Sequence, residues 1–323
     1  MDTYRRLDDL PPIADSVLTV GTFDGLHRGH LAVISRLVEK SRSKAVPTVV
    51  ITFDPHPQHI LASPGTPKLE LIATLNRKLI LLEKAGVDLT LVLRFDTEFS
   101  RITAVEFLEK IIVDHFHPSH IIVGYDHHFG NQRQGNAQFL REHARVYGYE
   151  ADIVQAVDDS DTIVSSANIR QLLREGHCTE AEQLLGWPYE IPGKIMPGTG
   201  RGRMLDYPTA NLTPEESTQL IPKAGVYIVS ADVHGQTIFG MCNVGYRPTF
   251  NGKALSVEAH FFDLPENNLY NQTLAFRFHH RLRDEQKFSN AAELRNQLDR
   301  DRHNSMEWIN QHQGGKPVHA AVS

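Results

Sequence analysis

The sequence contains few cysteines and lacks a long apolar run. Cys178 and Cys242 are its two cysteines among 323 residues, too few and too widely spaced for a disulfide framework or a zinc-ligand pattern. No segment approaches the about 18 consecutive apolar residues typical of a membrane-spanning helix. Lysine and arginine are scattered over a chain of net charge −6, without the basic stripe typical of nucleic-acid binding. We therefore expect a cytoplasmic protein that binds neither membranes nor nucleic acids.

Histidine, in contrast, is abundant, with 18 residues. Several lie close together in the sequence, which raises the alternative of a zinc site. However, adjacent histidines on a strand point to opposite faces, and no cysteine or carboxylate set completes a four-ligand pattern. We interpret them as surface or loop histidines; the pairs are His127 and His128, His56 and His59, His115 and His117, and His279 and His280.

The chain length and a change in the pattern of predicted elements along it indicate two domains. A chain of 323 residues exceeds what one hydrophobic core usually supports. Strand-like and helix-like segments alternate up to about residue 185, which indicates a doubly wound parallel sheet with helices. After that point short strands with glycine and proline punctuation indicate a small closed β structure followed by one helix. We expect a first domain at 1–185, a second at 186–312 and a flexible tail at 313–323. The expected strands are 17–20, 46–53, 89–95, 121–124, 190–196, 225–233, 237–244, 255–262 and 274–282; the expected helices are 75–85, 103–114, 133–147, 166–174 and 290–311.

The segment 20–30, Val-Gly-Thr-Phe-Asp-Gly-Leu-His-Arg-Gly-His, joins the first of these strands to a helix. A strand, a glycine-rich turn and a helix start present backbone N–H groups to a phosphate. Gly29 allows a close backbone approach, so His27 and His30 are both able to donate to one anion. His-x-Gly-His after a strand is typical of the nucleotidylyltransferase superfamily, whereas the simpler interpretation is two loop histidines beside a tight turn.

Further motifs follow along the chain. They are Thr-Phe-Asp-Pro-His-Pro at 52–57, Val-Gly-Tyr-Asp-His-His-Phe-Gly at 123–130, Val-Ser-Ser-Ala-Asn-Ile-Arg at 164–170, Gly-Thr-Gly-Arg-Gly-Arg at 198–203, Tyr-Pro-Thr-Ala-Asn at 207–211, Asn-Val-Gly-Tyr-Arg-Pro-Thr-Phe at 243–250 and Ser-Val-Glu-Ala-His at 256–260.

With these motifs in this order, the sequence resembles the bifunctional bacterial riboflavin kinase/FMN adenylyltransferases, or FAD synthetases, along nearly its whole length. The resemblance implies that the C-terminal domain phosphorylates riboflavin from ATP and that the N-terminal domain adenylylates FMN with a second ATP, releasing FAD and pyrophosphate. It also implies an N-terminal nucleotidyltransferase fold and a six-stranded all-β flavokinase barrel with a terminal helix. Riboflavin, FMN and ATP are then the partners, and Mg²⁺ is the expected cofactor.

For the adenylyltransferase site, the resemblance and the chemistry together assign His27, His30 and Arg170 to catalysis, because positioned donors and positive charge stabilise a reacting phosphate. The alternative interpretation of Asp24 and Asp126 is that each caps a turn. The expected nucleotide-binding residues are Gly21, Thr22, Phe23, Asp24, Gly25, Gly29, Ser165 and Ser166, and the expected flavin-binding residues are His56, Pro57, Gly124 and Asp126.

For the kinase site there is no Walker-type motif, and the resemblance places the glycine loop with Gly198, Gly200 and Gly202 over the ATP phosphates. Thr209 and Asn211 supply oxygens for Mg²⁺, which prefers hard ligands, and Arg247 is expected to bind flavin. Glu258 is the candidate general base that accepts the proton of the riboflavin hydroxyl. Judged from strand periodicity alone, Glu258 is simply a solvent-facing residue.

The sequence departs from the family pattern at a few positions. Thr22 replaces an asparagine, Asp206 stands where the pattern has glycine, and Ala167 and Asn168 remove a hydroxyl and a positive charge near the expected phosphates. Two other hypotheses therefore stay open. One is an enzyme with a single active half, most plausibly the kinase, and the other is a flavin-binding regulator without turnover.

Overall fold

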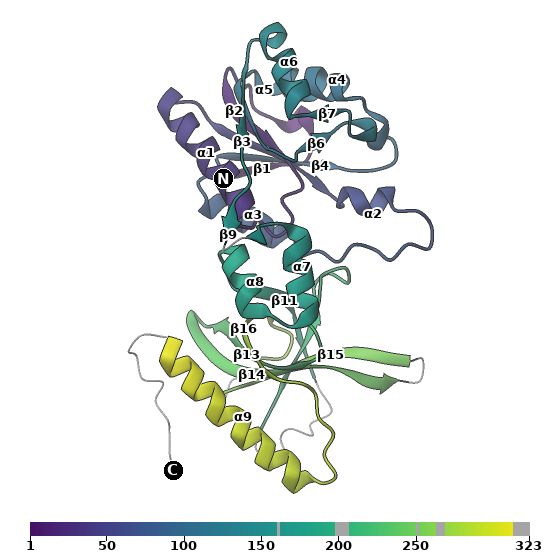
Figure 1. The fold of residues 1–323 in the computed structure, drawn as a ribbon, viewed down its shortest axis with the longest axis vertical. Helices are drawn as coiled ribbons and strands as arrows, with labels where there is room; N and C mark the ends of the chain where they lie inside the picture. Colours follow the sequence, from purple (N-terminus) through teal and green to yellow (C-terminus); the bar gives the residue numbers. More distant parts are fainter. Residues whose placement is uncertain (160–161, 198–206, 250–251, 263–268, 313–323) are drawn as a thin grey trace. The chain divides into compact units, whose positions relative to one another are not determined.

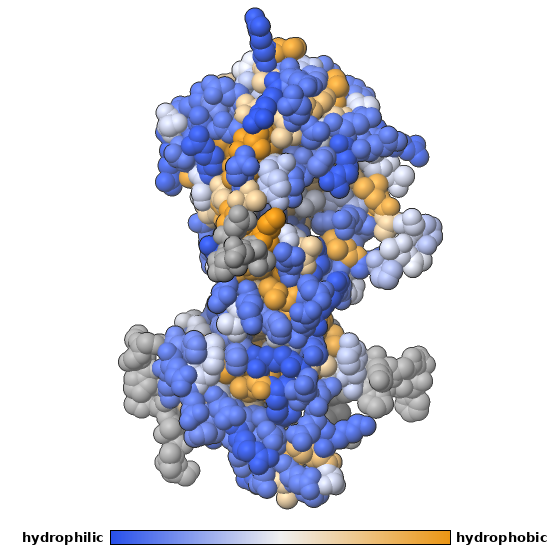
Figure 2. All heavy atoms as spheres, viewed as in Figure 1, coloured by the Kyte–Doolittle hydropathy of each residue, from blue (hydrophilic) through white to orange (hydrophobic). Residues whose placement is uncertain are grey.

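A computed structural model describes residues 1–159, 162–197, 207–249, 252–262 and 269–312. Within it the chain divides into two compact units, Met1–Ile169 and Arg170–Ser323, which we call the first and second units (Figure 1). The expected tail at 313–323 and the glycines Gly198, Gly200 and Gly202 lie outside the described residues. On the face shown in Figure 2, hydrophilic residues cover most of each unit and hydrophobic residues form small separate patches.

The first unit is built on a six-stranded parallel sheet, which confirms the predicted α/β class. Its strand order is β1-β4-β3-β2-β5-β8, so that β3 and β5 flank β2 and the chain order reverses there. The edge strands β1 and β8 were not predicted, because one is very short and the other carries two carboxylates. The bounds are β1 Asp2–Tyr4, β2 Ser16–Val20, β3 Thr48–Asp54, β4 Leu89–Arg94, β5 Pro118–Gly124 and β8 Glu150–Val154.

Two apolar cores, one against each face of this sheet, hold the helices in place. One core joins Val17 and Val50 of the sheet to Ile34 and Leu37 of α1, and the other joins Leu18 and Leu91 to residues of α4, α5 and α6. Because strand side chains alternate, successive strand residues serve opposite cores. The helices are α1 Arg28–Lys44, α2 Pro57–Leu61, α3 Leu75–Lys84, α4 Ala104–Phe107, α5 Asp114–Phe116 and α6 Ala137–Tyr147.

Two of the predicted helices differ in detail from the structure. Thr103 and Glu106 form the predicted capping box, but the helix after it contains a π-helical segment, Leu108–Val113, between α4 and α5. Helix α6 begins at Ala137 rather than 133, because Gly135–Asn136 pairs as β7 with β6, His128–Phe129. The remaining short elements are 3-10 turns at Leu7–Asp9, Phe99–Arg101 and Asn131–Arg133, and strands β9 Asp158–Asp159 and β10 Thr162–Ile163.

The second unit is a closed barrel of six antiparallel strands in the order β11-β12-β15-β14-β13-β16, which confirms the predicted all-β fold. Fully buried Tyr189, Tyr227, Phe276 and Phe278 are among the largest side chains of its core. Strand β12 was not predicted, since its five residues include one asparagine, one threonine and one proline. The bounds are β11 Tyr189–Met196, β12 Ala210–Pro214, β13 Gly225–Val233, β14 Gln236–Thr249, β15 Gly252–Phe261 and β16 Thr273–Arg283.

Three helices accompany the barrel segment: α7 Ser166–Glu175, whose first residues belong to the first unit, α8 Cys178–Leu185 and α9 Ala291–His312. Helix α9 matches the predicted terminal helix. A buried ion pair fixes it to β16, because Arg283 Nε and Nη2 donate to Asp301 at 2.9 and 2.7 Å. The same carboxylate accepts a hydrogen bond from Gln297 at 2.8 Å, so this buried anion is well satisfied.

Candidate functional sites

The turn between β2 and α1 places the start of that helix at the carboxyl edge of the sheet. Phe23, Gly25 and Leu26 have φ angles of 47°, 79° and 33°, so three of four consecutive residues adopt the left-handed region. Phe23 O accepts a hydrogen bond from Leu26 N at 3.1 Å, which closes the turn. Such backbone strain is found mainly where a surrounding site requires it. The turn lies where the strand order reverses, the usual ligand position in open α/β sheets.

His27 and His30 stand together at this helix start. His27 is the N-cap residue, and its Nδ1 accepts from the backbone N–H of His30 at 3.3 Å. The two rings are stacked, with centroids 3.7 Å apart and planes 18° apart. A Cβ at Gly29 would come within 3.2 Å of the His27 ring and 3.4 Å of Val164 O, so glycine permits this close approach. The structure thus brings the two histidines of the motif into one pair.

Burial decides the charge state of His30. It lowers the pKa of His30 well below the ordinary value of 6.5, and the nearby His27 and Lys78 lower it further. The ring is therefore neutral at pH 7. Its Nδ1 is buried and has no hydrogen-bond partner among the residues that the structure describes. A buried polar atom left unpaired carries a free-energy cost of about 1–3 kcal/mol, which a bound polar ligand would offset.

Asp24 contacts backbone rather than standing open toward a ligand. Its carboxylate accepts from Ile72 N at 3.0 Å and Ala73 N at 3.4 Å. Its carbonyl oxygen accepts from the Ser166 hydroxyl at 3.0 Å. Asp24 thereby fixes the segment that leads into α3 to the segment that begins α7. These contacts agree with the turn-capping interpretation, and its phosphate-binding role stays a prediction.

Lys78 is a buried cation near this site that the motif analysis missed. It lies on α3, and its Nζ donates to Thr52 Oγ1 at 3.3 Å. The Thr52 hydroxyl in turn donates to Thr22 O at 3.3 Å, which connects Lys78 to the motif. The sequence did contain a sign of this burial in the spacing of residues. Lys78 lies one helical turn before the buried Leu82, on the face of α3 that packs inward.

The other predicted residues of this site follow neighbouring strands or begin α7. His56 caps α2, directly after β3, and accepts from Gln58 N at 3.2 Å. Gly124 ends β5, and the turn that follows it, closed by His127 N donating to Gly124 O at 3.2 Å, contains the exposed Asp126. The carboxyl ends of β2, β3 and β5 therefore carry these residues at one edge of the sheet. Pro57 is the first residue of α2. Before α7, Ser165 Oγ accepts from Asn168 N at 3.2 Å. The buried Arg170 follows Ser166 by four residues on α7.

In the second unit, strand register assembles a polar row. Asn211 of β12 lies directly opposite Glu258 of β15, and Glu258 lies opposite Asn243 of β14. Directly opposite residues share a face of the sheet, so the three side chains share one face. Thr209 precedes β12 by one residue and Asn211 by two. The Glu258 carboxylate accepts from Ser256 Oγ at 2.5 Å. Arg247 pairs with Ala254 in the β14–β15 ladder, but its side chain is outside the described part.

The histidine pairs were partly misjudged as surface or loop residues. His279 lies on strand β16, where burial lowers its pKa to about 4 and Ser230 Oγ lies 2.9 Å from Nε2. His127 lies in the turn between β5 and β6, as predicted for a loop residue, although burial lowers its pKa to about 4 and it stacks on Phe129. Among the described residues, no three histidines, cysteines or carboxylates are grouped so that they could hold a metal ion.

Comparison with known proteins identifies the family of this chain. The FAD synthetase family model matches residues 11–168, and the riboflavin kinase model matches residues 185–309. This chain belongs to the bifunctional riboflavin kinase/FMN adenylyltransferase family. It is 35% identical to the family member of Listeria monocytogenes over 288 residues, which cover 89% of this chain and 90% of the relative. It is 34% identical to that of Escherichia coli K12, with 92% and 94% covered.

A solved structure described as a macrolide-efflux protein from Streptococcus pneumoniae is also similar, with a TM-score of 0.86, 31% identity, and 95% of this chain and 99% of that chain covered. Within the residues described for the present protein, no helix has both the length and the apolar character that crossing a bilayer requires. Membership of the riboflavin kinase/FMN adenylyltransferase family makes this chain a transferase with flavins and ATP as its substrates.

Proposed function

We propose that residues 1–185 form the FMN adenylyltransferase domain and residues 186–312 the riboflavin kinase domain. The kinase converts riboflavin and ATP to FMN and ADP, and the adenylyltransferase converts FMN and a second ATP to FAD and pyrophosphate. The observation that carries the first assignment is the stacked His27–His30 pair at the start of α1. The one that carries the second is the aligned row Asn211, Glu258 and Asn243.

In the adenylyl transfer, an FMN phosphate oxygen attacks the α-phosphorus of ATP, and the bond from that phosphorus to the pyrophosphate oxygen breaks. The attacking oxygen is already anionic, so the step requires no general base; it requires donors aimed at the developing charge. Because His27 Nδ1 accepts the His30 N–H, the proton of neutral His27 lies on Nε2, which is then able to donate to phosphate. The neutral His30 ring donates through whichever nitrogen carries its proton.

The other residues of this site hold the two substrates. Arg170, Ser165 and Ser166 bind the β- and γ-phosphates from the start of α7, where a guanidinium fork and hydroxyls suit phosphate oxygens. The turn with Gly21, Thr22, Phe23, Asp24, Gly25 and Gly29 lies against the nucleotide, and His56, Pro57, Gly124 and Asp126 form the flavin side.

In the kinase step, Glu258 accepts the proton of the riboflavin 5′-hydroxyl as its oxygen attacks the γ-phosphorus, and ADP leaves. Thr209 and Asn211 offer a hydroxyl and an amide oxygen beside the Glu258 carboxylate, a donor set that fits Mg²⁺. When bound there, Mg²⁺ supplies positive charge that neutralises the ATP phosphates. Gly198, Gly200 and Gly202 cover the phosphates, and Arg247 binds the flavin.

The partners of this enzyme are then riboflavin, FMN and ATP, without nucleic acid or membrane. Cys178 and Cys242 are free and buried, the state expected in a reducing compartment, and this supports a cytoplasmic location.

Chromatographic product analysis tests the proposal. The protein is incubated with ATP and Mg²⁺ and either riboflavin or FMN. We expect FMN and then FAD from riboflavin, and FAD directly from FMN. FMN that accumulates without FAD means that the adenylyltransferase half is inactive, as the departures at Ala167 and Asn168 leave open. Binding of flavin without either product means that the chain is a flavin-binding regulator instead.

A further inference from the structure

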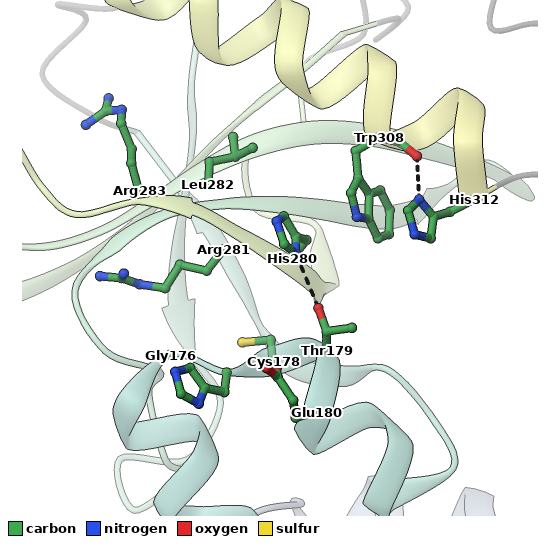
Figure 3. A pocket seen from close by; sticks show the side chains of 11 residues that line it. Gly176, Cys178, Thr179, Glu180, His280, Arg281, Leu282, Arg283, Trp308 and His312 are labelled. Atoms are coloured by element: carbon green, nitrogen blue, oxygen red, sulfur yellow. Dashed lines mark hydrogen bonds between the residues drawn. The ribbon is translucent and has the colours of Figure 1, made fainter.

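A cavity of about 560 Å³ lies within the second unit, away from the residues assigned to catalysis. Three elements line it: the start of α8, the last residues of β16 and the end of α9 (Figure 3). Its volume falls in the range of small-molecule sites, about 300–1,000 Å³. None of Thr209, Asn211 and Glu258 is among its lining residues.

One side of this cavity is a stack of three rings. Trp308, half-buried on α9, lies between His280 of β16 and His312 of α9. The ring centroids of Trp308 and His312 are 4.1 Å apart with planes at 12°, and those of Trp308 and His280 are 5.9 Å apart with planes at 15°. Nearly parallel aromatic rings beside a cavity offer a planar ligand a stacking surface.

Hydrogen bonds fix which ring nitrogen of each histidine carries a proton, and His280 keeps a nitrogen lone pair available. His312 Nδ1 lies 2.8 Å from Trp308 O, and since a carbonyl only accepts, this nitrogen carries the proton. The Thr179 hydroxyl donates to His279 O at 2.9 Å, so the contact of 3.4 Å between Thr179 Oγ1 and His280 Nδ1 has the nitrogen as donor. Burial lowers the pKa of His280, which keeps it neutral. In the neutral His280 ring, Nε2 is then the acceptor.

The charges of the lining do not favour an anion. Arg281 and Arg283 lie at the opposite end of the view from Trp308, and each donates to a carboxylate, although Nε of Arg281 is buried without a partner among the described residues. Arg281 donates to Asp284 at 2.6 Å, and Arg283 to Asp301 at 2.7 Å. Glu180 adds a negative charge to the wall. An uncharged ring fits this balance better than a phosphate group does.

We propose that this cavity is a non-catalytic binding site for a planar heteroaromatic ring with an N–H donor, as found in adenine and in the flavin ring. The ring stacks against Trp308 on the side of His280, whose centroid lies 5.9 Å away, and its N–H group donates to Nε2 of His280. Because the reactions of this family use and produce both ring systems, either one is a source of the ligand. The site would then let the second unit bind a substrate or product ring outside its catalytic residues.

Fluorine NMR of the full-length protein labelled with 5-fluorotryptophan tests this site. The chain has two tryptophans, so two resonances are expected, and Trp187→Phe assigns them. Titration uses riboflavin and adenosine, which lack phosphate, with inorganic phosphate as a third arm. We expect a saturable shift of the Trp308 resonance with one or both rings, while the resonance of the buried Trp187 stays in place. The ring that shifts it more strongly identifies the source.

Three variants separate this site from the catalytic ones. Glu180→Tyr fills the cavity from an exposed position and should abolish the shift, and His280→Ala should raise the half-saturation concentration about twofold to tenfold, as expected for one lost hydrogen bond. His303→Ala, on an exposed part of α9, is the matched control and should change nothing. The proposal is overturned if neither ring moves the Trp308 resonance, if phosphate alone reproduces the shift, or if the shift persists in Glu180→Tyr.

Discussion

Removal of the carboxylate of Asp301 should detach α9 from the barrel and lower the stability of the second unit. The Asp301 side chain is 2% exposed and that of Arg283 is 21% exposed. Asp301→Ala leaves the Arg283 guanidinium without its ion-pair partner and removes the acceptor of Gln297. Breaking a buried pair from one side costs about 3–5 kcal/mol. Because Arg283 is able to reach water, we expect the lower end, about 3 kcal/mol.

Urea denaturation followed by tryptophan fluorescence measures this loss. Both tryptophans, Trp187 and Trp308, belong to the second unit, so the signal reports on that unit rather than on the first. With a slope of about 2 kcal/mol per molar urea, the midpoint should fall by about 1.5 M. The matched control is Arg300→Ala, whose exposed side chain donates to Gln297 Oε1 and makes no contact with the Arg283–Asp301 pair among the described hydrogen bonds. It should change the free energy of unfolding by less than about 0.5 kcal/mol.

The double variant distinguishes an ion pair from mere loss of packing. If the buried pair acts as a unit, Arg283→Met with Asp301→Leu should cost less than the sum of the single changes, by a coupling of about 1–3 kcal/mol. Additive costs, or an Asp301→Ala midpoint equal to that of Arg300→Ala, would refute the reasoning.

Three further predictions concern catalysis, pH and backbone. His30→Gln should slow FAD formation from FMN about 10²- to 10³-fold without affecting FMN formation, and Glu258→Gln should do the reverse; in a folded protein, loss of both activities from either change contradicts the assignment. For His127 and His279, folding lowers the pKa from 6.5 to about 4, so the unfolded chain binds more protons and stability is lost as pH falls from about 6.5 towards 4. The free energy of unfolding of the observed unit, from urea titrations, should fall between pH 7 and pH 5 by up to about 1.4 kcal/mol per pH unit for its buried histidine. With tryptophan fluorescence, which reports on the second unit, His279→Phe should reduce that slope; an unchanged slope would contradict it. Gly176→Ala should destabilise the second unit by more than about 1 kcal/mol, because φ is +88° there and a Cβ would lie 2.5 Å from Arg281 Cδ; the thermal unfolding midpoint measures this, and an unchanged midpoint counts against it.

The motif at 20–30 predicted a strand, a turn and a helix start around His27 and His30 correctly, because these residues lie in one short stretch of chain. A strand, a glycine turn and a helix start follow from local rules, so the carboxyl edge of the sheet and the His27–His30 pair could be foreseen. The same holds for Thr103 and Glu106, whose capping box depends on three residues of spacing. Local chemistry is readable from sequence when both partners of a contact are close in the chain.

Contacts between distant segments were not predictable in this way. The bonds of Asp24 to Ile72 and Ala73 span about fifty residues, and the burial of Lys78 depends on Thr52 across the fold. Strands β1, β8 and β12 escaped prediction because they are short and carry little apolar pattern, and only pairing with longer neighbours makes them strands. Propensity is a weak guide where tertiary contacts decide the conformation.

In the barrel, the alignment of Asn211, Glu258 and Asn243 depends on the same strand register as the burial of apolar residues. Leu212 and Val257, which alternate with Asn211 and Glu258, form the next pair of the β12–β15 ladder and are 5% and 2% exposed. A one-residue slip of either strand would turn Glu258 away from Asn211 and expose an aliphatic side chain at the same time. A barrel with misaligned strands is therefore also less stable, so the apolar residues that stabilise this part of the barrel keep the proposed kinase residues Asn211 and Glu258 facing one another.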